Sequence, residues 1–117
     1  MLTEQEIFDK VSTHLLRQGG RSSFGGACKY RGEHGLKCAA GCLIPDDKYV
    51  PEMEGMRWAI MIQQNCGKFL NELTSFAGHR LISTLQKVHD KRAPVDWRGQ
   101  LKELAVAKGL VFAHCED

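Results

Sequence analysis

The chain has 117 residues, of which 43% are hydrophobic and 26% are charged, and its formal net charge is +2. These values suit one soluble globular domain, residues 1–117, and the charge is below the strong positive bias of a dedicated nucleic-acid-binding domain. No apolar run reaches the ~20 residues of a membrane span, and the N-terminus lacks a basic region followed by an apolar one, so we expect no membrane contact and no signal peptide.

The first predicted helix covers residues 4–18. Thr3 and Glu6 match a capping box at its start, and the apolar residues that follow repeat every four positions. Gly19 is expected to end the helix. The small, glycine-rich segment 19–27 is then predicted to be a loop, and because it lacks the GxxxxGK[ST] pattern we do not expect it to bind phosphate.

Residues 28–40 alternate between two kinds of side chain on either side of a glycine-containing turn. This alternation predicts a β-hairpin. Its apolar face would carry Cys28, Tyr30, Leu36, Cys38 and Ala40. Its opposite face would carry Lys29, Arg31 and Lys37, which would give the hairpin a small basic surface.

Further helices are predicted after a turn that begins at Pro45. One starts at Pro51 and stops before Gly67, and another follows over residues 68–90, as one helix or as two that break near Gly78. The last begins near Pro94, a favourable residue for a first turn, and closes at Lys108 and Gly109. We therefore expect an α+β fold with about four helices and one small hairpin.

Cysteine and histidine gather in one short stretch, which raises the question of a zinc site. The candidate ligands are Cys28, His34, Cys38 and Cys42, in the spacing C-x5-H-x3-C-x3-C. Zinc favours four such ligands, but the CxxC spacing that helps two thiolates bind one ion is missing. Cys66, His114 and Cys115 would add ligands only through folding that the sequence does not show. We expect no cofactor, and a zinc-stabilised module stays as an alternative.

The cysteines favour a cytoplasmic protein with reduced thiols, because their number is odd and no export signal accompanies them. None lies in a signature of a catalytic thiol, and His14, His79 and His89 are expected on solvent-facing sides of helices. The acidic segment 46–54 lacks the spacing of a calcium loop. We therefore predict that the protein is not an enzyme.

The stretch CKYRGEHGLKCAAGCLIPDDKYVPEMEG (28–55) resembles a family of small uncharacterised bacterial and phage proteins with the pattern C-x-YR…GLKCAxGCLIPD…Y. The segment LISTLQKVHD (81–90), followed by a proline and a tryptophan-containing helix, fits the same layout. The resemblance implies no catalytic activity. It implies a cytosolic accessory protein of phage or prophage origin, and many such proteins bind host proteins, including defence complexes such as CRISPR.

We therefore predict a monomer or homodimer that binds a host protein complex. The candidate partner-binding residues are Lys29, Tyr30, Arg31, Lys37, Asp46, Asp47 and Trp58. The two aspartates would mimic phosphate at arginine-lined sites of the partner. The runner-up is a nucleic-acid-binding module that uses the basic hairpin face, although the nearby acidic segment would repel phosphate.

Overall fold

Helices dominate the computed structural model, which describes residues 1–24, 27–63 and 68–114. The α-helices of these ranges are α1 (Glu4–Gln18), α2 (Trp58–Gln63), α3 (Lys68–Leu73), α4 (Phe76–Lys91) and α5 (Trp97–Lys108). Short 3-10 turns lie at Glu33–Gly35, Gly41–Leu43, Pro51–Met53 and Pro94–Asp96. Within the described ranges, no helix combines the length and the apolar character needed to cross a membrane.

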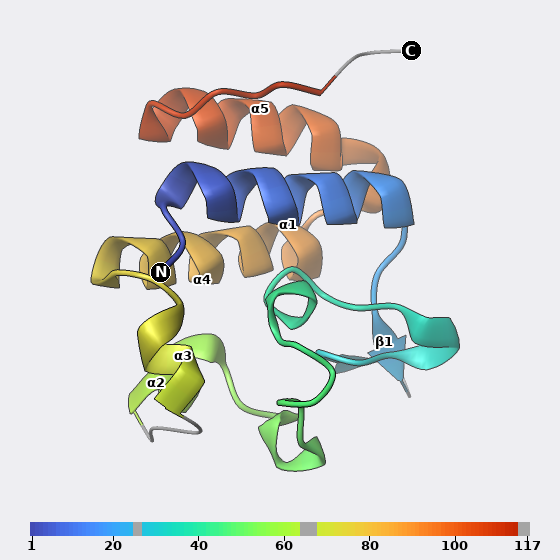
Figure 1. Cartoon of the computed structure of the whole chain (residues 1–117). Helices are drawn as coiled ribbons and strands as arrows, with labels where there is room; N and C mark the ends of the chain where they lie inside the picture. Colours follow the sequence, from blue (N-terminus) through green and yellow to red (C-terminus); the bar gives the residue numbers. More distant parts are fainter. Residues whose placement is uncertain (25–26, 64–67, 115–117) are drawn as a thin grey trace.

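Three long helices form the main body, and each of α1, α4 and α5 packs against the other two (Figure 1). Their apolar faces supply much of the buried core. The largest fully buried side chains on these helices are Ile7, Phe8, Leu15, Leu81, Ile82, Leu85, Trp97 and Leu101. The helix α2 packs against α4, and the turn Gly41–Leu43 packs against α1. The central segments of the chain therefore lie against the α1–α4 side of this body.

The prediction for α1 is confirmed at both ends. The Thr3 hydroxyl accepts a hydrogen bond from the Glu6 amide at 3.1 Å, and the Glu6 carboxylate accepts one from the Thr3 amide at 3.0 Å. Gly19 closes the helix in the left-handed conformation, with φ of 68°. All of these features are local, so residues close in sequence determine them.

The predicted α+β class, with a hairpin over residues 28–40, is wrong. Among the described residues, the strand pairing is one antiparallel ladder between β1 (Ser23–Phe24) and β2 (Ala27–Cys28), together with isolated bridges such as Arg31 with Lys37. Between the residues of that bridge, the Gly32 amide donates to the Leu36 carbonyl at 2.9 Å, around the turn Glu33–Gly35. The alternation of this stretch therefore reflects a loop folded against helices, where inner side chains meet the core without a sheet.

The later helices follow the predictions in part. The turn at Pro51 is separate from α2, because Gly55 between them has φ of +83°. The chain breaks between α3 and α4 at Ser75, whose hydroxyl accepts the Gly78 amide hydrogen bond at 3.1 Å. The predicted stop before Gly67 lies outside the described residues. The predicted end of α5 at Lys108 and Gly109 is confirmed, and the Leu110 amide donates to the Ala105 carbonyl at 2.8 Å, as in a Schellman closure.

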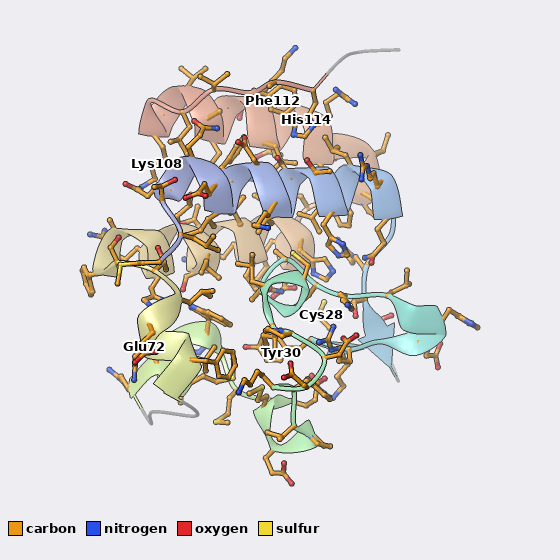
Figure 2. All side chains as sticks on the ribbon, in the orientation of Figure 1. Cys28, Tyr30, Glu72, Lys108, Phe112 and His114 are labelled. Atoms are coloured by element: carbon orange, nitrogen blue, oxygen red, sulfur yellow. The ribbon has the colours of Figure 1, made fainter. Side chains whose placement is uncertain are left out.

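The C-terminal segment 110–114 returns over α1 and α5 (Figure 2). Phe112 meets Phe8 edge to face, with ring centroids 6.4 Å apart. His114 Nε2 lies 2.7 Å from the Ser12 hydroxyl. This segment thus covers the side of α1 that carries Phe8 and Ser12.

Replacement of Gly41 by alanine tests the close packing of the Gly41–Leu43 turn. A Cβ at Gly41 would overlap the backbone carbonyl of Tyr30, which cannot rotate away as a side chain can. We expect Gly41→Ala to lower the free energy of unfolding by about 1–3 kcal/mol. The control Gly99→Ala lies in α5 with open space around its added Cβ, and it should raise stability by up to about 1 kcal/mol. Urea denaturation measures both, and unchanged stability of Gly41→Ala would contradict this packing.

Candidate binding cleft

A cleft of about 640 Å³ lies between the second half of α4 and the start of α2, and we refer to it as the α4 cleft. Segments 28–30 and 54–57 form its other walls. From α4 it is lined by Ser83, Gln86, Lys87, Asp90 and Lys91. Their spacing of three and four positions places these five residues on one helix face, so α4 presents a continuous polar wall.

Positive charge surrounds the α4 cleft. Its cations are Lys29, Arg57, Lys87 and Lys91. In the part of the chain that the structure describes, none of these four side chains forms an ion pair. The carboxylates that line the cleft are Glu54 and Asp90. Both accept hydrogen bonds from groups of the protein itself, so the four cations remain available to a binding partner.

Glu54 links two loops at one end of the cleft. Its carboxylate accepts hydrogen bonds from the Tyr30 amide at 3.0 Å and the Arg31 amide at 3.1 Å. It also accepts one from the Tyr49 hydroxyl at 2.8 Å. Burial and this hydrogen bond raise the pKa of Tyr49 to about 12. Glu54 therefore fixes the segment 30–31 that forms the wall of the cleft.

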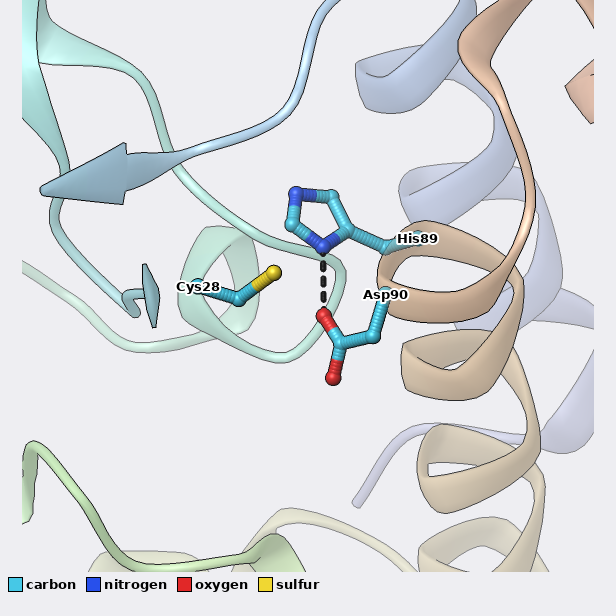
Figure 3. Close-up of side chains that lie close together, drawn as sticks. All are labelled: Cys28, His89 and Asp90. Carbon is cyan, nitrogen blue, oxygen red and sulfur yellow. Dashed lines mark hydrogen bonds and ion pairs between the residues drawn. The ribbon is translucent and has the colours of Figure 1, made fainter. Parts of the chain in front are cut away.

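Cys28, His89 and Asp90 form a tight cluster in which the thiol, imidazole and carboxylate atoms lie within 4.8 Å of one another (Figure 3). Cys28 comes from β2, and the other two come from the end of α4. His89 is fully buried, whereas Cys28 is exposed. His89 Nδ1 lies 2.7 Å from Asp90 Oδ1, and the Ser22 amide donates to His89 Nε2 at 3.0 Å.

The hydrogen bonds of His89 determine which of its nitrogens carries the hydrogen. A backbone amide can only donate, so the lone pair of Nε2 is used by Ser22, and Nδ1 must hold the hydrogen that Asp90 accepts. An Nδ1 that carries a hydrogen has no lone pair for a metal ion. The cluster as it stands therefore fits a structural histidine and does not fit a zinc site.

Catalysis by the thiol of this cluster is also disfavoured. Burial and the negative charge of Asp90 raise the pKa of Cys28, whereas a nucleophilic cysteine needs a lowered pKa. Burial would raise the pKa of Asp90 as well, but hydrogen bonds from His89, Gln86 and Cys28 outweigh it and hold that pKa below its ordinary value. The raised pKa of Cys28 and the lowered pKa of Asp90 favour a protonated thiol beside an ionised carboxylate.

The four cysteine and histidine residues predicted as zinc ligands are not brought together. Across residues 1–24, 27–63 and 68–114, no three of them place their ligand atoms close enough to share an ion. The Cys42 thiol donates to the Ala39 carbonyl at 3.0 Å, and the Cys38 sulfur accepts from the Gly41 amide at 3.3 Å. Burial raises the pKa of both thiols to about 12. Cys66 and Cys115 lie outside the described residues.

The predicted partner-binding residues divide into two groups. Lys29, Tyr30 and Trp58 line the α4 cleft. Tyr30 and Trp58 are buried there. Both are also hydrogen-bonded, because the Tyr30 hydroxyl donates to the Met56 carbonyl and the Trp58 indole donates to His79 Nδ1 at 3.1 Å. The remaining predicted residues lie outside the cleft.

Arg31, Lys37 and Asp46 form an ion cluster, in which the Asp46 carboxylate lies 3.1 Å from the Arg31 guanidinium and 3.5 Å from Lys37 Nζ. Arg31 also donates to the Ile44 carbonyl at 2.7 Å and lies over the Tyr49 ring. Two cations share one carboxylate here, so the cluster is paired but keeps a net charge of +1. Asp47 is exposed beside it.

The prediction that three helical histidines face solvent is wrong for His89 and holds only in part for His14 and His79, which are half-buried. His89 is buried, and its ring stacks on Trp97 with centroids 5.5 Å apart. His79 accepts from Trp58, and His14 Nε2 donates to the Lys37 carbonyl at 2.8 Å. Burial lowers the pKa of both His14 and His79. The sequence does indicate that His89 is buried, because it follows Leu81 and Leu85 at helical spacing on the apolar side of α4.

A second, more open groove of about 880 Å³ runs along α1. Lys37 lines it, but this lysine is paired with Asp46. Lys10 and Arg17 add positive charge, and Asp9 adds negative charge. The α4 cleft therefore combines more available cations with more enclosing walls, and we regard it as the stronger candidate site.

Comparison of the chain with known protein families, curated proteins and solved structures found no match. The family resemblance of residues 28–55 stays a prediction.

Proposed function

We propose that this is a cytosolic, non-catalytic protein that binds a protein partner through the α4 cleft. The observation that carries the proposal is the set of four cations, Lys29, Arg57, Lys87 and Lys91, which surround a partly apolar cleft without an ion partner among the described residues. Charge that a protein leaves uncompensated around a concave site steers a partner of opposite charge and selects against wrong partners.

The chemistry of the cleft supports binding over catalysis. Its one exposed thiol, Cys28, has a raised pKa, and the histidine beside it uses both ring nitrogens in hydrogen bonds to the protein. An activated thiol nucleophile requires a pKa near the working pH, and a general base requires a free lone pair, and these two groups have neither. The histidine that looks reactive in the sequence therefore serves to hold the segment before β1 against α4.

The form of the cleft favours a protein partner over nucleic acid. Single strands bind through bases that stack on exposed aromatic rings, but Tyr30 and Trp58 are 7% and 2% exposed. Duplex grooves are read by a helix or ribbon that protrudes, whereas the cations here surround a hollow. The resemblance to phage proteins would place this partner in a bacterial host, and inhibition of a host-defence complex is the narrower form of the proposal.

Capture from bacterial lysate tests the proposed function. Tagged wild-type protein is compared with Lys29→Glu/Lys87→Glu, which reverses two charges of the cleft. The control Lys48→Glu/Lys108→Glu makes the same change in net charge at exposed sites outside the cleft. We expect a bacterial protein to be enriched by the wild type and the control and lost with the cleft variant.

Two outcomes of the capture experiment would overturn the proposal. If the wild type enriches no protein above an unrelated bait, the binding function is wrong. If both double variants enrich the same protein equally, the partner binds elsewhere and the α4 cleft is not the site. Thermal melting of each variant beforehand shows that loss of capture does not arise from unfolding.

A further inference from the structure

We infer that the α4 cleft accepts an acidic amphipathic segment of the partner, whose apolar side chains enter the cleft and whose carboxylates meet the surrounding cations. This inference rests on the function proposed above and adds the chemistry of the bound segment. Two properties of the cleft carry it: its amide and carboxylate groups already have hydrogen-bond partners within the protein, and its four cations have no ion partner among the described residues.

The side-chain amide and the carboxylates that line the cleft already have hydrogen-bond partners within the protein. Gln86 uses both ends of its amide: its oxygen accepts from the Ala40 amide at 2.8 Å, and its nitrogen donates to Asp90 at 2.8 Å. Asp90 and Glu54 accept hydrogen bonds as described above. A polar group of a ligand that enters beside Gln86, Asp90 and Glu54 would compete with these existing bonds while losing its own hydrogen bonds to water. The part of the ligand that enters is therefore expected to be apolar.

The walls provide contacts for apolar side chains. Met56 and Ile60 are partly exposed in the cleft, and Tyr30 and Trp58 lie buried behind the same walls. Hydrogen bonds from Tyr30 and Trp58 fix the two rings, so this side of the cleft is preformed. Methionine is flexible and adapts to ligands of different shape.

The cations lie on more than one wall. Lys87 and Lys91 are one helical turn apart on α4, whereas Lys29 lies next to β2 and Arg57 precedes α2. A bound segment would thus meet positive charge on both of its sides. Each exposed pair contributes up to about 1 kcal/mol, and several together increase the association rate. An arginine can also bind one carboxylate through two hydrogen bonds.

Fluorescence anisotropy with defined probes tests the inference. The main probe is a short fluorescein-labelled peptide that alternates pairs of leucine and glutamate. A matched peptide has glutamine in place of glutamate, and oligothymidylate of similar length represents single-stranded nucleic acid. We expect the glutamate peptide to bind, to bind less tightly at higher salt, and to exceed both other probes in affinity.

Variants then assign the binding to the cleft. Lys29→Glu/Lys87→Glu should weaken binding of the glutamate peptide about tenfold, whereas Lys48→Glu/Lys108→Glu should leave it unchanged. Met56→Gln replaces an apolar side chain by a polar one of similar length, so it should weaken binding of the leucine side chains. Because the charge is unchanged, the salt dependence should stay the same. Circular dichroism confirms that each variant is folded.

Each contrary result has a distinct meaning. Equal binding of the glutamine peptide would overturn recognition of acids. Tighter binding of oligothymidylate, lost in the cleft variant, would identify a nucleic-acid site, and a wild-type dimer lost in that variant would identify a second copy as the occupant. If lysate capture depends on the cleft but the peptide does not bind, the inference fails while the proposed function stands. If the peptide binds but no host protein is captured, the proposed function fails.

Discussion

Trp97→Ala is expected to lower the free energy of unfolding by about 3–5 kcal/mol. Trp97 is fully buried at the start of α5, its ring stacks on His89, and its indole donates to the Arg92 carbonyl at 3.2 Å. Alanine would leave a cavity where α4 and α5 meet and would expose His89. Since domains are typically stable by about 5–15 kcal/mol, a large share of the stability would be lost.

Denaturant unfolding, followed by far-ultraviolet circular dichroism, measures this effect. Trp97→Phe keeps an aromatic ring against His89 and should cost less than alanine. Val95→Ala changes a side chain that is 88% exposed two positions earlier and should alter stability by less than about 0.5 kcal/mol. Equal unfolding midpoints for Trp97→Ala and Val95→Ala would show that the α4–α5 contact does not depend on the indole. If the alanine variant does not fold, the ranking of the other two still tests the prediction.

The sequence predicts the helices best where their ends depend on neighbouring residues. The bounds of α1 follow from the capping box at Thr3 and Glu6 and from Gly19, and the end of α5 follows from Gly109. These signals act within about one helical turn, so no knowledge of the tertiary fold is needed. The same rules left open one helix or two over residues 68–90 and put the possible break near Gly78, whereas the break lies three residues earlier, at Ser75. In the structure, Gly78 is buried within α4, where an added Cβ would overlap Thr74.

The hairpin prediction fails for a different reason. An alternating pattern predicts that every second side chain is buried, but Cys28 on the predicted apolar face is exposed, and Cys38, Ala39 and Ala40 are buried in succession. Tyr30 and Cys38 are indeed buried, yet the segment makes its main contacts with helices and loops. Arg31 and Lys37 are likewise close to each other, as a hairpin would place them. The sequence could not show that Asp46 binds both, because that contact depends on the path of the loop between them.

The α4 cleft could not be predicted as a unit. It joins Lys29, Arg57 and Lys87, which are far apart in the chain and have no shared pattern. Only the α4 wall could be predicted from the sequence, because its polar residues recur at helical spacing. The sequence predicts Lys29 and Trp58 as partner-binding residues, from the charge of one and the aromatic ring of the other. Both line the cleft, although Trp58 is buried within its wall. Their role in binding stays a prediction.

Asp90→Ala is expected to lower the free energy of unfolding by about 3 kcal/mol at neutral pH. The carboxylate accepts hydrogen bonds from buried His89 and from Gln86, and bonds to a charged acceptor contribute about 1.5–3 kcal/mol each. Without it, the His89 Nδ1 hydrogen would be buried without a partner. Asp90→Asn keeps one oxygen that can accept this hydrogen, so it should cost less. Asp47→Asn, at an exposed site, should have little effect.

The effect of Asp90 should also depend on pH in a defined direction. Its pKa in the folded protein is below the ordinary value of 3.8, so folding favours the ionised carboxylate. The stabilisation is fully present above that ordinary value and is lost as pH falls through the lower pKa of the folded state. We therefore expect the wild type to exceed Asp90→Asn by a constant amount near neutral pH and by a shrinking amount below pH 3.8. Urea midpoints of the two proteins across this range measure the difference. A difference that stays constant into strong acid would show that the negative charge of Asp90 does not stabilise its bonds with His89 and Gln86, and that only the shape of its side chain matters.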